Sequence, residues 1–330
     1  MRPFHYEHAA DRGQALKAGA VAGAQYLAGG TTLVDLMKLD VLRPATVVDI
    51  NALSREHGEI RADGERLRLG ALARMSDVAD HPAVRRDYPL IAQSLDLAAS
   101  PQIRNMASLG GNVLQRTRCT YFRDTSWNAC NKRDPGSGCA AMEGVNRKLA
   151  VLGVSDHCIA NYPGDFAVAL AALGATVDLE GSGGRRVIPF DALHRLPGDT
   201  PHIETSLRPG ELITGFSVPA GPWTRRSLYL KIRDRQSYEF ALASAAVALD
   251  LDGGVVREAR IGLGGVAARP WRSAEAEAAL RGKPLSEATA QAAADAAFAG
   301  AVAHGALRFK PELGRRTLVR ALLQARAMEV

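Results

Sequence analysis

The sequence predicts an α+β protein with two domains. In the last third, two apolar β patterns flank Asp252-Gly253-Gly254, and alanine-rich helical patterns follow them, an order typical of α+β domains. Before that, short β patterns alternate with helices around glycine-containing loops. Pro219, Gly221 and Pro222 separate the two parts and mark a domain boundary. A chain of 330 residues is long enough for two cores, so we predict domains at 1–220 and 221–330.

The first domain is predicted to contain two lobes, 1–55 and 56–220. Helical spacing begins at Asp11, an N-cap residue, and another helix follows Thr31, a second candidate N-cap. The periodicities predict helices at 11–22, 31–38, 90–99 and 165–173, and strands at 25–28, 46–50, 66–70, 175–180 and 212–218. Residues 107–113 are predicted to form a glycine turn that leads into an apolar strand.

The second domain is predicted to be a sheet followed by helices. The β patterns cover 227–233, 241–251 and 255–266, and the helical patterns cover 273–279, 286–303 and 311–327. Gly262-Leu263-Gly264-Gly265 lies inside a β pattern, so we interpret it as strand or bulge, not as a nucleotide-binding loop.

Composition excludes several functions. The net charge is +6 and the pI is about 9.3, but the basic residues are dispersed and aromatics make up only 5%, which argues against nucleic-acid binding. No apolar run is long enough for a membrane span, and residues 1–8 do not form a secretory signal. We therefore expect a soluble, cytoplasmic protein, or a periplasmic one if a signal-bearing partner exports the folded complex.

The sequence also lacks the signatures of common enzymes. There is no GxGxxG that opens a helix after a strand, no HExxH, no GxSxG and no Walker motif. Classical hydrolase chemistry and a Rossmann domain are therefore not expected. The chain is more typical of a protein that holds a cofactor.

Two glycine loops are candidate anion sites. Gly29-Gly30 in the segment 28–32 lies between a predicted strand and a predicted helix, and Gly110-Gly111 in the segment 108–112 repeats the pattern about eighty residues later. Glycine allows close backbone approach, and free N–H groups at a helix start bind phosphate. A plain strand-to-helix turn is the alternative for each loop. Together, the two loops suit a dinucleotide better than a single phosphate.

All four cysteines, Cys119, Cys130, Cys139 and Cys158, lie in one 40-residue window. Four thiolates are the usual ligands of an iron–sulfur cluster, so we favour such a cluster; a zinc site, and reduced or disulfide-bonded cysteines, remain alternatives. The turn at 134–139 could direct amide N–H groups at sulfur. His157 is a further candidate ligand, although a solvated histidine is the simpler interpretation. From Arg116 to Cys158, basic side chains that would stabilise an anionic cluster outnumber acidic ones: Arg116, Arg118, Arg123, Lys132, Arg133, Arg147 and Lys148, against Asp124, Asp134, Glu143 and Asp156.

Four ordered motifs carry a family resemblance that covers essentially the whole chain. They are 28–38 (AGGTTLVDLMK), 108–112 (SLGGN), 163–165 (PGD) and 230–233 (LKIR). This set resembles the FAD-binding medium subunits of the molybdenum hydroxylases, which include xanthine dehydrogenase, carbon monoxide dehydrogenase and aldehyde oxidoreductases. With its cysteines, the chain is most similar to the subunits of bacterial periplasmic aldehyde oxidoreductases that carry an additional [4Fe-4S] cluster. Residues 116–162, which hold every cysteine, look like an insertion relative to most of the family.

The resemblance implies a fold and a set of binding residues. The fold would be a two-lobed FAD-binding domain of the PCMH/vanillyl-alcohol-oxidase type, followed by a CO-dehydrogenase-flavoprotein-like α+β domain. The cluster ligands would be the four cysteines. Asp165 could instead be a helix N-cap, and Lys231 a solvated strand residue. The implied FAD-binding residues are Leu27, Ala28, Gly29, Gly30, Thr31 and Thr32 around the pyrophosphate, Ala107, Ser108, Gly111, Asn112 and Gln115 near the flavin, Asp165 on the adenosine side, Leu212 and Ile213 on the ring system, and Lys231 near the flavin.

The implied function is electron transfer inside an oxidoreductase complex, with no catalytic side chain in this chain. A large subunit with a molybdenum cofactor would oxidise an aldehyde or N-heterocycle, and a small subunit with [2Fe-2S] clusters would pass electrons to FAD, in a heterotrimer or a dimer of heterotrimers. The [4Fe-4S] cluster would either conduct electrons or staple its loop. Two alternatives stay open: a zinc-binding, non-redox scaffold, and a stand-alone flavin oxidase of related fold.

Overall fold

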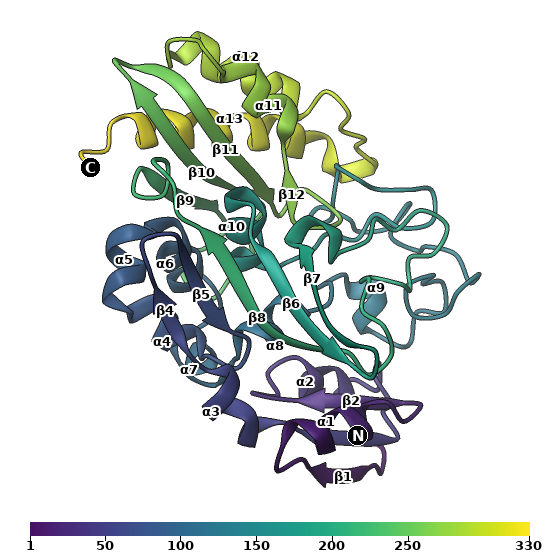
Figure 1. The fold of residues 1–330 in the computed structure, drawn as a ribbon. Coiled ribbons are helices and arrows are strands. Elements are labelled where there is room, and N and C mark those ends of the chain that lie inside the picture. Colours follow the sequence, from purple (N-terminus) through teal and green to yellow (C-terminus); the bar gives the residue numbers. More distant parts are fainter.

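A computed structural model describes all residues, 1–330. Figure 1 shows three layers along the long axis, with the N-terminal lobe at one end, the C-terminal domain at the other and a five-stranded sheet between them. No helix is long and apolar enough to cross a bilayer. The expected α+β class is confirmed by this architecture.

The N-terminal lobe is built on a small parallel sheet in the order β1-β3-β2. Asp11 caps the first helix as predicted, because its carboxylate accepts from the backbone N–H of Gln14. Thr32 precedes the second helix but makes no side-chain capping bond. The elements are β1 (His5–His8), α1 (Arg12–Gly19), β2 (Ala24–Leu27), α2 (Leu33–Lys38) and β3 (Thr46–Asp49). The short helices η1 (Asn51–Leu53) and α3 (Ser54–His57) lead out of the lobe.

The middle layer is an antiparallel sheet in the order β4-β5-β8-β6-β7. Every residue of α10 is buried, as expected for a helix that is apolar all round. The strands are β4 (Ile60–Ala62), β5 (Arg66–Gly70), β6 (Thr176–Gly181), β7 (Gly184–Pro189) and β8 (Leu212–Pro219). The helices are α4 (Met75–Asp80), α5 (Pro82–Asp87), α6 (Pro89–Asp96), α7 (Pro101–Met106), α8 (Leu109–Val113), α10 (Asp165–Leu173) and η2 (Phe190–Ala192).

The predicted strand after the second glycine turn is wrong. Residues Leu109–Val113 form the short helix α8, and the Ser108 hydroxyl caps it by accepting from the N–H of Gly111. The physical reason is that the cap and the main-chain bonds from Leu109 to Ala73 and from Gly110 to Ala71 satisfy the free amides at the helix start, and together they offset the low helix propensity of two glycines.

The C-terminal domain is an antiparallel sheet in the order β12-β11-β10-β9, with helices packed on it. The predicted hairpin is confirmed: β10 pairs with β11, and both Gly253 and Gly254 have positive φ, as a tight two-residue turn requires. The helix predicted at 286–303 is shorter and ends at Ala297. The elements are β9 (Ser227–Ile232), β10 (Ala243–Asp252), β11 (Val255–Gly264), β12 (Trp271–Arg272), α11 (Ala274–Leu280), α12 (Glu287–Ala297), η3 (Gly305–Phe309) and α13 (Lys310–Arg326).

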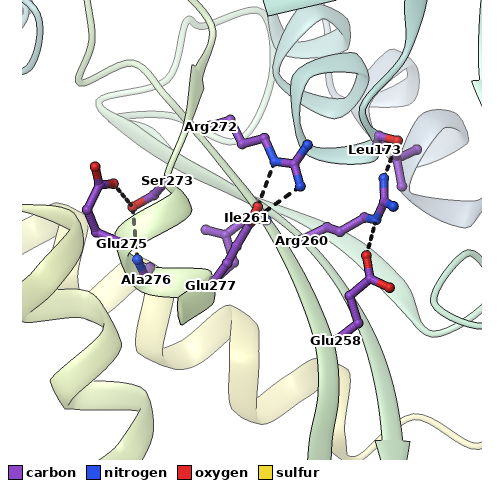
Figure 2. Close-up of polar contacts among 9 residues, drawn as sticks. All are labelled: Leu173, Glu258, Arg260, Ile261, Arg272, Ser273, Glu275, Ala276 and Glu277. Carbon is purple, nitrogen blue, oxygen red and sulfur yellow. Dashed lines mark hydrogen bonds and ion pairs between the residues drawn. The ribbon is translucent and has the colours of Figure 1, made fainter. Parts of the chain in front are cut away.

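Polar contacts join this sheet to the middle layer. Figure 2 shows Arg260, on β11, donating to the carbonyl of Leu173 at the end of α10 and to the carboxylate of Glu258. Glu277, on α11, accepts from Arg272 and from the N–H of Ile261. These bonds satisfy the end of a buried helix and fix α11 across the sheet.

The cysteine-bearing segment has little regular structure beyond α9 (Thr120–Arg123). Its apolar side chains, Tyr121 and Phe122 among them, belong to the same buried cluster as β10, β11, α12 and α13. The segment therefore packs into the core of the C-terminal domain, although it lies between elements of the middle layer in the sequence.

Candidate functional site

The first glycine loop directly contacts Met106 and Ala107, the two residues that lead into the second glycine loop. Gly29 lies so close to the end of α7 that a Cβ on it would be 1.9 Å from the carbonyl oxygen of Met106. Gly30 has φ of +73°, which favours glycine. The first loop then leads into α2, where Val34 donates to the carbonyl of Gly30 at 3.0 Å. Only glycine at position 29 allows this junction.

The second loop is fixed to the middle sheet by main-chain bonds. Gly110 donates to the carbonyl of Ala71 at 2.8 Å, and Ala71 donates to that of Thr214 on β8 at 3.1 Å. Leu212 and Ile213, at the start of the same strand, are both buried. Two main-chain hydrogen bonds therefore connect the second loop to the strand that carries Leu212 and Ile213, the residues predicted to pack on the ring system of FAD.

Asn112 carries an unused polar atom. Its side-chain Oδ1 is buried and has no hydrogen-bond partner, a state that costs free energy unless a ligand or water supplies a donor. The nearby Gln115 side chain donates to the main-chain carbonyl of Asn112 at 2.9 Å. A first loop that must be glycine where it packs on the chain leading to the second, and an amide oxygen without a partner in the second, fit a bound dinucleotide.

Asp165 and Lys231 pair with each other. Lys231 Nζ lies 2.7 Å from Asp165 Oδ2, and both side chains are almost fully buried. Tyr229 donates to the other carboxylate oxygen at 2.7 Å, and Lys231 also donates to the carbonyl of Leu97. Burial raises the pKa of Asp165, and its two donors oppose that shift.

The ion pair excludes the two alternative roles considered for these residues, a helix N-cap for Asp165 and a solvated strand position for Lys231. Asp165 is not the N-cap of α10, which is Gly164, and Lys231 is not solvated, because β9 faces α10 and α6 at that point. The pair joins the two predicted domains. The implied contacts of Asp165 and Lys231 with FAD remain predictions.

All four cysteines line one small cavity and are free thiols, so no disulfide is present. Burial raises the pKa of Cys119 to about 12 and that of Cys158 to about 11. The other cysteines in the cavity add to both shifts. No group of three or more His, Cys, Asp or Glu side chains is arranged to hold a metal ion. The donor type and the common cavity fit a thiolate-bound metal group, whereas the side-chain positions are not those of a formed site.

The turn at 134–139 was predicted to direct amide N–H groups at sulfur, but it binds the side chain of Asn131 instead. Its Gly136 and Gly138 amides donate to the Oδ1 of Asn131, at 3.1 and 2.8 Å, and not to sulfur. Asn131 also donates to the carbonyl of His157 at 3.0 Å. Other amides do face sulfur: that of Ala160 is 3.5 Å from Cys158 Sγ, and those of Tyr121 and Phe122 face Cys119. The side chain of His157 is exposed and lies 3.4 Å from Asp199, so the solvated interpretation holds.

Two acidic residues anchor the cysteine segment to the rest of the protein. Asp35, on α2, accepts from Arg118 and Arg123. Glu204 pairs with Arg116 at 2.6 Å and with Lys132 at 2.5 Å. Part of the basic excess in this window is therefore used to bind the rest of the protein.

A second cavity lies between the end of α8 and the cysteines. Its lining includes Gln115, His194 and Cys158. His194 Nε2 is 3.1 Å from the carbonyl of Val113, whereas its Nδ1 has no partner. Burial lowers the pKa of His194 to about 4, so the ring is neutral at pH 7.

Sequence reasoning missed several organising residues. Asn51, Arg74 and Asn131 tie loops together through hydrogen bonds to main-chain atoms. Nothing in local periodicity identifies such contacts. The Asn-to-glycine spacing around the turn at 134–139 was the one available signal, because asparagine often bonds to nearby backbone.

Comparison with known proteins identifies the family. The FAD binding domain in molybdopterin dehydrogenase matches residues 2–221, and the CO dehydrogenase flavoprotein C-terminal domain matches residues 228–330. The chain is 46% identical to the aldehyde oxidoreductase FAD-binding subunit PaoB of Escherichia coli (strain K12), over 99% of each chain. It is 28% identical to the carbon monoxide dehydrogenase medium chain of Hydrogenophaga pseudoflava, over 90% of this chain and 85% of the relative.

A solved structure has the same fold. Carbon monoxide dehydrogenase from Hydrogenophaga pseudoflava, in a form that lacks the Mo-pyranopterin moiety, superposes with a TM-score of 0.75 over 99% of this chain and all of that one, at 28% identity. The chain therefore belongs to the FAD-binding medium subunits of the molybdenum hydroxylase family.

Proposed function

We propose that this chain is the FAD-carrying electron-transfer subunit of a molybdenum-containing aldehyde oxidoreductase complex. A small [2Fe-2S] subunit would deliver electrons and an external acceptor would remove them. The observation that carries the proposal is the junction of the two glycine loops, in a chain that is 46% identical from end to end to an aldehyde oxidoreductase FAD-binding subunit. Bound FAD would supply the redox chemistry, because a flavin can collect single electrons and release them as a pair.

The chain's own residues bind and orient the cofactor. The backbone of 28–32 would hold the diphosphate, since glycine permits close approach and a helix start favours anions. Asn112 Oδ1 would accept a hydrogen bond from the ligand, which satisfies its buried oxygen. Leu212 and Ile213 would exclude water from the ring system.

We also propose that Cys119, Cys130, Cys139 and Cys158 bind a [4Fe-4S] cluster. Support comes from the common cavity and from the amide of Ala160 that faces sulfur. Without a metal, the raised pKa values of Cys119 and Cys158 keep these thiols protonated at pH 7. Cluster binding would therefore release protons and would have to draw the four sulfurs closer together.

The test is flavin and metal analysis of the complex purified anaerobically with its partner subunits. We expect one flavin and one four-iron cluster per chain of this type, together with a molybdenum subunit. In the variant Cys158→Ser, iron should fall while FAD remains; Ser155→Ala, three residues away, is the matched control. A complex without flavin would refute the FAD proposal. Because the small [2Fe-2S] subunit also contributes iron, the cluster would be refuted if Cys158→Ser leaves the iron content unchanged.

The same variants address the role of the cluster. If Cys158→Ser slows reduction of FAD by aldehyde in rapid-mixing experiments, the cluster lies on the electron route. If the rate is unchanged but the segment becomes sensitive to protease, the cluster is a structural staple.

A further inference from the structure

Arg74 lies at the junction of the two glycine loops. Its backbone is fixed there by a β-bridge with Ser108 and by the bond from the N–H of Met75 to the carbonyl of Ala107, 3.0 Å long. One end of its guanidinium donates to the carbonyl oxygen of Met106, the same atom on which Gly29 packs. Arg74 therefore contacts the second loop at its point of contact with the first.

Asn51 extends this contact to the first loop. Its Oδ1 accepts from Arg74 at 3.1 Å, and its Nδ2 donates to the carbonyl of Ala28 at 3.0 Å. Asp49 orients the asparagine by accepting from both its N–H and its Nδ2 at 2.8 Å. Arg74, Asn51 and the two loops thus form a closed ring of contacts.

Arg74 forms no ion pair, because the nearby carboxylate of Asp49 bonds to Asn51 and Tyr6 instead. Both of its acceptors are uncharged, a main-chain carbonyl and an amide oxygen. The loop segments 27–32 and 106–112 contain no charged residue at all. A guanidinium without an ion-pair partner, beside loops that carry no charge, attracts an anion, and its planar fork of donors suits phosphate oxygens.

We propose that Arg74 is a positioning residue for the diphosphate of FAD: its guanidinium holds the two glycine loops at the spacing that the dinucleotide needs and supplies positive charge to the cradle. This inference rests on the proposed FAD-binding function and adds to it a residue outside both glycine motifs. Asn51 has the supporting role of connecting Arg74 to the first loop.

The experiment compares FAD with riboflavin, which lacks the diphosphate. The full-length chain in its complex is stripped of flavin and titrated with each ligand, and binding is followed by flavin fluorescence. The variants are R74Q and R74K. The matched control is R104Q, because Arg104 is also half-buried and donates to a main-chain carbonyl, that of Ala98, without contacting either glycine loop.

We expect R74Q to weaken FAD binding roughly 10- to 100-fold, as loss of a charge-assisted contact does, and to leave riboflavin binding unchanged. FAD affinity of the wild type should fall with added salt more steeply than that of R74Q. R74K should restore the salt dependence but not the full affinity, because lysine cannot bridge both acceptors. R104Q should match the wild type.

Equal losses of FAD and riboflavin affinity in R74Q would show a merely structural role and overturn the proposal, as would unchanged FAD affinity. If R74Q does not assemble, R74K carries the test, and equal losses for both ligands in that variant have the same meaning. A wild-type complex with no affinity for FAD would refute the proposed function as well, so the two failures are distinguishable.

Discussion

The junction of the glycine loops makes a sharp prediction for Gly29→Ala. The new Cβ would lie 1.9 Å from the Met106 carbonyl oxygen and 3.1 Å from the Cα of Ala107. Both neighbours are backbone, so no flexible side chain can move away. The two backbones would have to separate by about 1.5 Å to restore an ordinary contact of 3.4 Å.

The cost follows from two effects. Overpacking at a rigid contact costs about 1–3 kcal/mol, and separation of the loops weakens the bond from Arg74 to Met106, a charged contact of about 1.5–3 kcal/mol. We expect a loss of about 3 kcal/mol in the free energy of unfolding, together with loss of bound flavin.

Urea unfolding of the full chain and flavin content of the purified complex are the assays. Gly64→Ala is the control, because a Cβ there has no heavy atom within 4 Å and needs no unusual φ; it should change stability by less than about 1 kcal/mol. If Gly29→Ala unfolds at the wild-type urea concentration and keeps its FAD, the proposed packing of the two loops is wrong.

Three further predictions concern buried ionisable groups. Lys231→Met should cost about 3–5 kcal/mol in unfolding free energy because it leaves the Asp165 carboxylate buried and unpaired; urea unfolding measures it, and a double variant with Asp165→Asn should recover part of the loss. In the folded protein the pKa of His194 is about 4, below the ordinary 6.5. The unfolded state therefore binds the proton first as the pH drops. The free energy of unfolding should fall by up to about 3 kcal/mol between pH 6.5 and pH 4. His194→Gln should flatten that slope, whereas His157→Gln, at an exposed site, should not. Burial also lowers the pKa of Lys310 to about 7. The free energy of unfolding should therefore rise as the pH increases from about 7 toward 10. If a Lys310→Met variant keeps this rise, Lys310 is not its cause.

The elements that the sequence predicted correctly are determined by residues close to them in the chain. The hairpin at 252–254 needs two consecutive residues with positive φ, and two glycines supply them. The first helix begins where Asp11 can accept from Gln14. Both signals lie within a few residues of the structure that they determine, so no tertiary information is needed to interpret them.

The features that sequence did not predict depend on distant partners. α8 replaces an expected strand because Ser108 caps it and because Gly110 bonds to Ala71. The sequence pattern around Lys231 is that of an alternating strand. Lys231 pairs with Asp165, 66 positions earlier, only because α10 packs beside β9 in the folded protein. Periodicity cannot show which strand a buried helix will contact.

The cysteine segment shows how a long excursion can become part of three structural units. Asp35 binds it to α2, Glu204 binds it to the middle layer, and Val151 donates to the carbonyl of Val266 beside the C-terminal sheet at 2.8 Å. A metal group held by four cysteines would cross-link this segment, which has little regular structure. The free energy of metal binding would then stabilise the folded segment. Because Asp35 follows the first glycine loop by only a few residues along α2, ordering of the cysteine segment would also restrain the loop that holds the FAD diphosphate. The cluster would therefore help to order this loop even if no electron ever passes through it, while the contacts between the two glycine loops keep FAD bound when the cluster is lost.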